Sequence, residues 1–248
     1  MTYCLSLHCC EGLVFLSDSR SSAGVDNITI HPKMRVYERR GDRVLCLLSS
    51  GNLSITQSVS ALIDRDLEKS SSHPDLPNLL NQSNLFDTVH YVGGLIREVQ
   101  NRDADAFQRA NLNFNINLIL GGQIAGQPPQ IYQIYPVGNA IHDSRESPFL
   151  QIGDLKYGKP ILDRGFTYNT PLAEAVKFGL LSLDATAKSN LSVGTPFELF
   201  CYRTDSLEAR HRLKFEENDP YLTTVRERWQ SGLIQLVRDI PELESLKP

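Results

Sequence analysis

The grouping of strand-like segments into blocks, separated by long helical segments, is the feature of this sequence that most constrains its fold. Residues 3–9 place alternate apolar side chains on one face, which predicts a strand. Residues 12–17 form a continuous apolar run, which is typical of a strand covered on both faces. Residues 35–38 and 43–49 are predicted to pair as a hairpin across the polar turn between them. The chain is therefore predicted to begin as a set of strands.

The periodicity changes after Gly51. Apolar residues between 55 and 67 follow helical spacing, and a surface loop rich in Ser, Pro and Asn is predicted for residues 70–84. A second helix is predicted from Leu85 to about Asp105. Two long helices are thus expected to follow the first strands.

Strand patterns then return and are interrupted by one more helix. Alternation predicts a strand over 112–120, with its turn beginning at Gly121-Gly122 and its partner at 130–135. A short apolar strand is predicted at 149–152, followed by a helix with Thr170 as N-cap and Pro171 at its first position. A strand at 197–202 and a last helix near 220–240 complete the chain.

This order favours two stacked sheets with helices on both outer faces. We expect an α+β fold, a four-layer αββα sandwich. Residues 1–248 contain no segment that reads as an interdomain linker, so a single domain is predicted, with the last helix packing on it or extending from it.

Composition restricts the class of protein. The 248 residues are 41% hydrophobic, with a net charge of -4 and both signs interspersed, so we expect no nucleic-acid partner. No apolar run approaches the roughly 20 residues of a membrane span, and no basic leader precedes the first apolar segment. The five cysteines are irregularly spaced, which favours reduced thiols and a cytoplasmic location.

Thr2, Asp18 and Lys33 are candidates for a catalytic group. Removal of Met1 would leave Thr2 with a hydroxyl and a free α-amine, and an amine with a pKa of about 8 can act as the base for that hydroxyl. A cation lowers the pKa of such an amine, and an acid can anchor the cation. If the first two strands pair, the three residues converge at one end of a sheet. The alternatives are a frayed terminus, a turn aspartate and a surface lysine.

Several segments resemble one family over nearly the whole chain, up to about Glu217. The layout is similar to the proteasome-type β-subunits, which are N-terminal-nucleophile hydrolases, and most closely to the bacterial proteasome-related family called Anbu. The segments that carry the resemblance include TYCLSL, GLVFLSDSRSSAGVDNI, KMRVYER, LLSSGNLSITQ and SNLSVGTPFEL.

The resemblance implies a threonine-type peptidase that works inside a ring or helical homo-oligomer. It implies that Thr2 is the nucleophile, that Lys33 lowers the pKa of the amine and that Asp18 holds Lys33. The backbone N–H of Gly51, next to Ser50, would donate to the oxyanion. Three further residues would flank the substrate cleft, where an extended peptide would pair as an added strand: Ser19, Arg20 and Ser22.

The chain departs from the family pattern at two places. Proteasome β-subunits have a serine in the turn after the strand that corresponds to 149–152, where this chain has Gly153-Asp154. They also have an aspartate near the end of the third helix, where this chain has Asn190, followed by Ser192. The field around the amine is therefore predicted to differ, with Asp154 as a compensating acid.

Two other motifs are rejected as sites. Residues 153–160 resemble a phosphate loop, but Pro160 stands where a Ser or Thr would hold magnesium, so a strand-to-helix turn is the better interpretation. Adjacent residues on a strand face opposite sides, so His8, Cys9 and Cys10 are not predicted to bind a metal. His31 is expected in a surface loop, although a place near the cleft remains open. We expect neither a metal nor a cofactor.

Three functions remain open on this evidence. The first is a self-compartmentalised threonine-type peptidase acting on peptides or unfolded proteins. The second is an amidohydrolase of the same mechanism acting on a small amide or an isopeptide. The third is a non-catalytic assembly subunit, against which the joint presence of Thr2, Asp18 and Lys33 argues.

Overall fold

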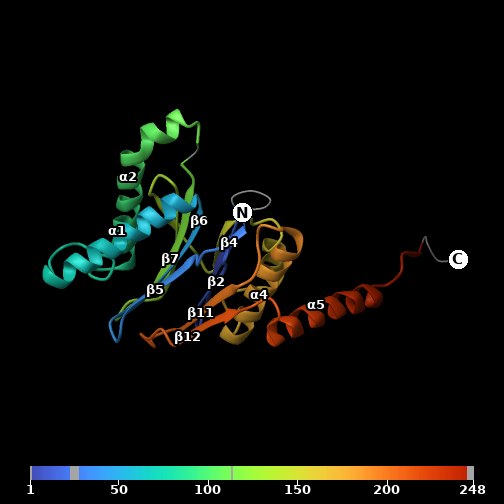
Figure 1. The fold of residues 1–248 in the computed structure, drawn as a ribbon. Coiled ribbons are helices and arrows are strands. Elements are labelled where there is room, and N and C mark those ends of the chain that lie inside the picture. Colours follow the sequence, from blue (N-terminus) through green and yellow to red (C-terminus); the bar gives the residue numbers. More distant parts are fainter. Residues whose placement is uncertain (1, 23–27, 113, 245–248) are drawn as a thin grey trace.

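Two antiparallel sheets lie face to face, and helices cover the outer face of each (Figure 1). The computed structural model describes residues 2–22, 28–112 and 114–244. This arrangement confirms the predicted α+β sandwich of four αββα layers.

The first sheet has the strand order β10-β1-β2-β11-β12. Its strands are β1 (Tyr3–Cys9), β2 (Gly12–Asp18), β10 (Phe149–Gly153), β11 (Phe197–Arg203) and β12 (His211–Phe215). In β1 and β2, Cys4 lies opposite Ser17, so the start of β1 is beside the end of β2. This pairing places both ends at one edge of the sandwich.

The second sheet has the order β5-β6-β7-β8-β9, and a small sheet of two strands stands apart from it. The strands of the second sheet are β5 (Met34–Arg39), β6 (Arg43–Gly51), β7 (Ile116–Ile124), β8 (Gln130–Ile134) and β9 (Ala140–His142). The small sheet pairs β3 (Arg20–Ser22) with β4 (Ile28–Ile30).

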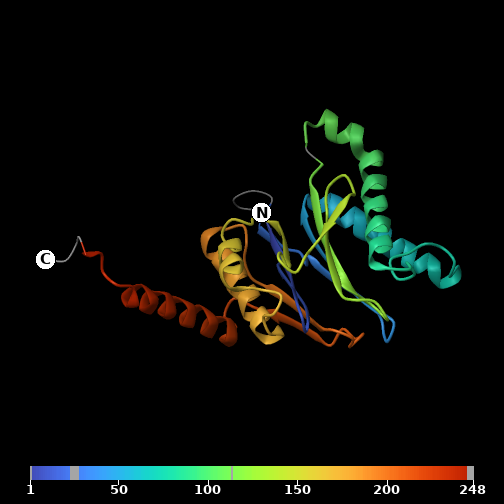
Figure 2. The same ribbon diagram turned by 180° about the vertical axis from the view of Figure 1, so that it is seen from behind.

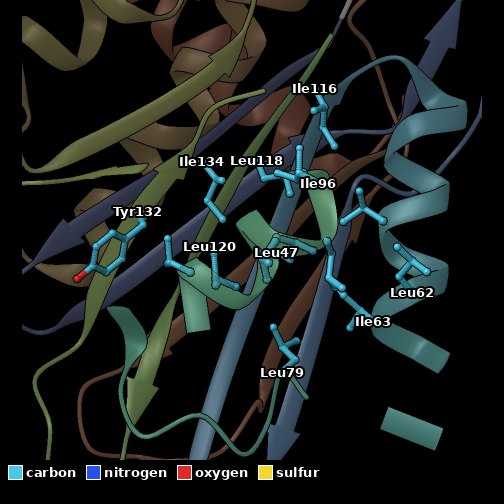
Figure 3. Close-up of a cluster of buried hydrophobic side chains, with 14 of the residues drawn as sticks. Leu47, Leu62, Ile63, Leu79, Ile96, Ile116, Leu118, Leu120, Tyr132 and Ile134 are labelled. Carbon is cyan, nitrogen blue, oxygen red and sulfur yellow. The ribbon is translucent and has the colours of Figure 1, made fainter. Parts of the chain in front are cut away.

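The helices divide between the two outer faces. Helices α1 (Leu53–Ser72) and α2 (Leu85–Arg109) cover the second sheet, and α3 (Lys159–Gly165) and α4 (Leu172–Ser189) cover the first. Figure 3 shows how side chains of the second sheet, such as Leu118 and Leu120, pack against Leu62, Ile63 and Ile96 from these helices. The two sheets meet in a separate apolar layer, where the rings of Phe15 and Phe200 stack with centroids 5.9 Å apart.

The strand predicted at 112–120 starts later and ends later than its alternation indicated. Leu112 is 58% exposed, whereas β7 begins at Ile116 and runs through Gly121-Gly122, which were predicted to begin the turn. A Cβ at Gly121 would come within 2.9 Å of the Phe15 ring on the facing sheet. A Cβ at Gly122 would overlap the carbonyl oxygen of Val44 on the neighbouring strand β6. The two glycines therefore permit close packing within and between the sheets instead of a turn, and the prediction was wrong there.

Helix boundaries show two smaller differences. Helix α1 continues to Ser72, past the predicted start of the loop. Helix α4 has Pro171 as its N-cap, and the Thr170 hydroxyl accepts the N–H of Thr167 at 3.0 Å instead of capping the helix.

Helix α5 (Pro220–Asp239) projects from the sandwich, as Figures 1 and 2 show from opposite sides. Leu222 is its buried residue, and Arg226 forms an ion pair with Asp184 of α4 at 2.5 Å. Its outer half exposes Leu233, Leu236 and Val237. None of the helices in the described part of the chain has a stretch long and apolar enough to cross a membrane.

Candidate active site

The carboxylate of Asp18 lies beside the start of the chain because β1 and β2 are antiparallel. The backbone N–H of Tyr3, the residue after Thr2, donates to Asp18 Oδ1 over 3.0 Å. This bond ties the first strand to the end of the second. The pairing of the first two strands, on which the predicted convergence depended, thus brings the N-terminal residues to the acid.

Lys33 completes a buried ion pair with Asp18. Its Nζ lies 2.8 Å from Asp18 Oδ1 and 2.5 Å from the backbone oxygen of Arg20, and the Lys33 and Asp18 side chains are 7% and 0% exposed. Burial raises the pKa of Asp18, and the Lys33 ammonium and the N–H groups of Tyr3 and Gly194 lower it in part. The desolvation of a buried charge pair is offset only when its remaining polar groups are also bonded. Here Lys33 makes two hydrogen bonds, and Asp18 Oδ2 is buried with no partner among the described residues.

The backbone of Thr2 is held from the other side by β10. The N–H of Asp154 donates to the Thr2 carbonyl oxygen at 2.8 Å, and Tyr3 pairs with Gly153 in the strand register. Gly153 has a φ of +93°, and a Cβ there would overlap the Thr2 carbonyl group. A glycine is therefore required for β10 to approach Thr2 this closely.

A cleft of about 720 Å³ opens beside Thr2, between the small sheet, the start of β5, the end of β6 and the first turns of α1. Thr2, Lys33, Ser50 and Gly51 line it together. Its wall also includes His31, for which the sequence favoured a surface loop and left a place near the cleft open. Three of the predicted site residues and the predicted nucleophile thus face one hollow.

Gly51 stands at the N-terminus of α1, at the end of β6. It has a φ of +109°, and a Cβ there would overlap the carbonyl oxygen of Asn115. Asn52 caps the helix by accepting the N–H of Ser54 at 2.9 Å. The Ser50 hydroxyl is directed to the Asn117 carbonyl oxygen, 3.5 Å away. A helix N-terminus behind a glycine favours negative charge in the cleft.

The two departures from the proteasome pattern lie in contact with each other. The side-chain amide of Asn190 donates to Asp154 Oδ2 over 2.5 Å, and both residues are buried. Asn190 Oδ1 accepts the N–H of Ser192 at 2.9 Å. The acid that is missing at the end of α4 is thus present on the facing turn as Asp154, whose backbone also binds Thr2.

Ser19 and Arg20, predicted to flank the cleft, place their side chains elsewhere. The Ser19 hydroxyl is buried, and the Arg20 guanidinium donates to the Leu191 carbonyl at 3.0 Å and lines a second hollow between α4 and α5. Arg20 contacts Lys33 through its backbone oxygen. The Ser22 side chain lies outside the described part of the structure, as do residues 23–27 of the segment predicted to pair with a peptide.

Two residues next to the site were not singled out from the sequence. The Tyr3 phenol is buried and bonds Ser182 of α4 at 2.7 Å and the amide of Gln151. Glu198 of β11 approaches the backbone N–H groups of Lys33 and Met34, which lower its pKa, although burial raises it overall. Tyr3 could have been singled out from the sequence because it directly follows the candidate nucleophile. Nothing in the sequence indicated Glu198.

The rejected motifs have ordinary structural places. Residues 153–160 form the turn into α3, where Lys159 pairs with Asp163. The His8 ring bonds Asp143 at 2.7 Å. Among the residues that the structure describes, no group of three or more His, Cys, Asp or Glu side chains is placed to hold a metal ion.

Three solved structures are similar to this chain over almost its whole length. Anbu (ancestral β-subunit) from Yersinia bercovieri is 39% identical, with 98% of each chain covered and a TM-score of 0.90. Anbu in a helical assembly from Pseudomonas aeruginosa is 39% identical, with 99% of this chain and 100% of that chain covered and a TM-score of 0.92. Anbu from Hyphomicrobium sp. strain MC1 is 38% identical, with 98% and 99% covered and a TM-score of 0.89.

No family model matches the chain, and a search of curated proteins finds no match either.

Proposed function

Because this chain belongs to the Anbu family of proteasome-related β-subunits, we propose that it is a threonine-type peptidase of the N-terminal-nucleophile class. The observation that carries the proposal is the buried Lys33–Asp18 pair, bonded to the backbone of the residue after Thr2 and located at a cleft that Thr2 lines. An ion pair so deeply buried is costly for stability, which supports a role in chemistry.

In the proposed reaction, loss of Met1 frees the Thr2 amine. The amine takes the proton of the Thr2 hydroxyl as its oxygen attacks the carbonyl carbon of the substrate amide. The Gly51 N–H donates to the oxyanion that forms, and the Lys33 ammonium keeps the amine pKa low enough for a neutral base. The amine then gives its proton to the leaving nitrogen, and an acyl ester remains on Thr2.

Water completes the cycle. The free amine removes a proton from a water molecule, which attacks the ester carbonyl and releases the acid, so Thr2 regains its hydroxyl. Asp18 stays ionised throughout and holds Lys33 in place. Neither step requires a metal or a cofactor.

The direct test is covalent labelling of the trimmed protein. A β-lactone that acylates hydroxyl nucleophiles is expected to add one mass increment to the N-terminal peptide, and Thr2→Ala is expected to lose both the increment and peptide hydrolysis. Thr29→Ala, a second threonine lining the cleft, is the matched control. Labelling that persists in Thr2→Ala would contradict the proposal.

A sample that retains Met1 is expected to be inactive, because its Thr2 nitrogen is an amide.

The Asp154–Asn190 contact favours a second candidate, an amidohydrolase of the same mechanism that acts on a small amide or an isopeptide. In this chain Asp154 lies in the turn where the proteasome pattern has a serine, and Asn190 stands where that pattern has an aspartate. A panel of peptides and small amides separates the two candidates by which class is turned over.

We also propose that the chain assembles with copies of itself in the cytoplasm. The relative from Pseudomonas aeruginosa forms a helical assembly, and α5 of this chain exposes a row of apolar side chains. All five cysteines are free, which supports a reducing compartment. A non-catalytic assembly role alone would leave the Lys33–Asp18 pair without a function.

A further inference from the structure

The cleft beside Thr2 is lined largely by polar side chains and includes two cations, and this is unusual for a pocket that would hold an apolar side chain. Its described lining includes Lys33, Arg35 and His31 but no Asp or Glu. Side-chain amides and hydroxyls provide most of the rest, among them Gln57 and Asn117.

The acids that neutralise the two cations lie outside this lining. Asp18, the partner of Lys33, is fully buried, and Asp64, the partner of Arg35 at 2.6 Å, is an exposed residue further along α1. Lys33 and Arg35 thus line the cleft, and neither of their carboxylate partners does. The charged residues among the described lining are therefore cationic.

Arg35 is positioned to serve as the selecting cation. It lies two residues after Lys33 on an extended segment, so the two side chains share one face. Its guanidinium is placed 5.3 Å from the ring centre of Tyr37, and one of its nitrogens is engaged by Asp64. A guanidinium has five N–H donors, so others remain for a substrate carboxylate.

Gln57, on the second turn of α1, provides a further group. Among the described residues its side-chain amide has no hydrogen-bond partner, and it lines the same cleft. An apolar side chain placed there would separate such polar groups from water without replacing their bonds, whereas an acceptor would satisfy them.

From these observations we propose that the cleft selects substrates with an acidic side chain on the acyl side of the scissile amide, and that Arg35 is the residue that recognises it. This inference rests on the proposed function, because the scissile bond is defined by attack from Thr2. It goes beyond that function in naming the substrate class.

The first test is turnover by the trimmed protein. Fluorogenic peptides that differ only in having Glu, Gln, Leu or Lys before the scissile bond are compared by kcat/KM. We expect Glu to be the best substrate and Lys the worst, with Glu at least about 10-fold above Leu. Arg35→Gln is expected to reduce the Glu-to-Gln ratio about 10-fold, and Arg35→Lys to restore part of it. Arg102→Gln, which removes an ion-paired arginine of α2 that does not line the cleft, should leave the ratio unchanged.

The second test measures binding without turnover. In Thr2→Ala, the Glu peptide is expected to bind more tightly than the Leu peptide by fluorescence polarisation, and adding Arg35→Gln should abolish that difference. Hydrolysis of all four peptides at equal rates would overturn the selectivity and leave the peptidase intact. Selective binding of the Glu peptide with no hydrolysis would support the selectivity and refute the peptidase. Preference for Leu or Lys, or no binding of any peptide, would overturn the inference.

Discussion

A single buried contact, between Lys33 and Asp18, connects the chemistry of this protein to its stability. Asp18 Oδ1 accepts from Lys33 and from the Tyr3 N–H, and Lys33 also donates to the Arg20 carbonyl oxygen. Asp18 Oδ2 is buried with no hydrogen-bond partner among the described residues, so removing Lys33 would leave the carboxylate charge in a dry environment. The same contact supplies the positive charge that the Thr2 amine needs in the proposed reaction.

Lys33→Ala is therefore expected to reduce kcat/KM by about 10²-fold or more, the range of general acid–base groups. The protein should still fold, with a loss of about 3–5 kcal/mol in the free energy of unfolding because Asp18 stays buried without its cation. Peptide hydrolysis and urea unfolding measure the two effects. Lys159→Ala, which removes a lysine from an exposed pair, serves as control, and a near-wild-type rate for Lys33→Ala would remove Lys33 from the site.

The cysteines are expected to differ in their rate of alkylation because they differ in burial, and mass spectrometry of the labelled protein measures that rate. Burial raises the pKa of the Cys4 and Cys46 thiols and raises that of Cys201 to about 11, whereas Cys10 is exposed. At pH 8 iodoacetamide is expected to label Cys10 first, because the reactive thiolate is scarce at the buried sites. Raising the pH to 9 should not bring Cys4 or Cys46 into reaction. Early labelling of Cys46 in folded protein would contradict this assignment.

At the scale of elements, the site depends on how closely β10 approaches β1. Gly153 permits this approach both by its backbone conformation and by its lack of a side chain. The register then places the Asp154 N–H on the Thr2 carbonyl.

Gly153→Ala is expected to destabilise the fold by more than the roughly 1–2 kcal/mol of left-handed strain, because the added methyl would displace Thr2. Activity should fall with it. Gly126→Ala is a matched control, since Gly126 also has a positive φ but open space around it. Equal losses in the free energy of unfolding for the two variants would show that close approach to Thr2 is unimportant.

The Tyr3 phenol connects β1 to α4 and β10 through its hydrogen bonds to Ser182 and Gln151. Tyr3→Phe removes the partner of the Gln151 side-chain amide, while Ser182 keeps its bond to the Gly158 carbonyl oxygen. A loss of about 1–3 kcal/mol in the free energy of unfolding is therefore expected. Tyr37→Phe provides the comparison, because the Tyr37 hydroxyl is buried with no hydrogen-bond partner among the described residues. It should be neutral or stabilising, and thermal unfolding of both variants measures the difference.

At the scale of the whole molecule, α5 has too little contact with the sandwich to be explained by the fold of one chain. Its outer half carries apolar side chains into solvent, and such a row is typical of a surface that another chain covers. Under the proposed self-assembly, the occupant is a second copy.

Leu236→Glu is expected to lower the mass of the assembly in sedimentation velocity, while circular dichroism shows an unchanged fold. Gln235→Glu adds the same charge on the same helix without removing an apolar group, and should assemble normally. An assembly that forms equally well in both variants would exclude this face of α5.

The fold class and the order of the main strands and helices were available from the sequence, whereas β3, β4, β9 and β12 were not predicted. The apolar run of β2 and the helical spacing after Gly51 each report how one segment is buried. Alternation predicted β1 as a strand, but the structure buries both of its faces. The choice of Thr2, Asp18 and Lys33 followed from their chemistry and from a family resemblance. The structure brings Asp18 and Lys33 into contact beside the N-terminal residues.

Only the tertiary structure decided how distant segments approach one another. The sequence predicted a turn at Gly121, whereas the structure shows that the facing sheet leaves no room for a side chain there. The sequence predicted Arg20 beside the cleft, whereas its guanidinium binds the Leu191 carbonyl oxygen in the loop after α4. The Asp154–Asn190 contact likewise joins residues 36 positions apart. By itself the sequence determined which residues have the chemistry of a nucleophile, base or cation and which segments have a buried apolar face. Both depend only on side-chain type and on the spacing of apolar residues within one segment. Which of these residues meet, and which direction each side chain faces, depends on packing between layers, and packing is set by atoms far apart in the chain.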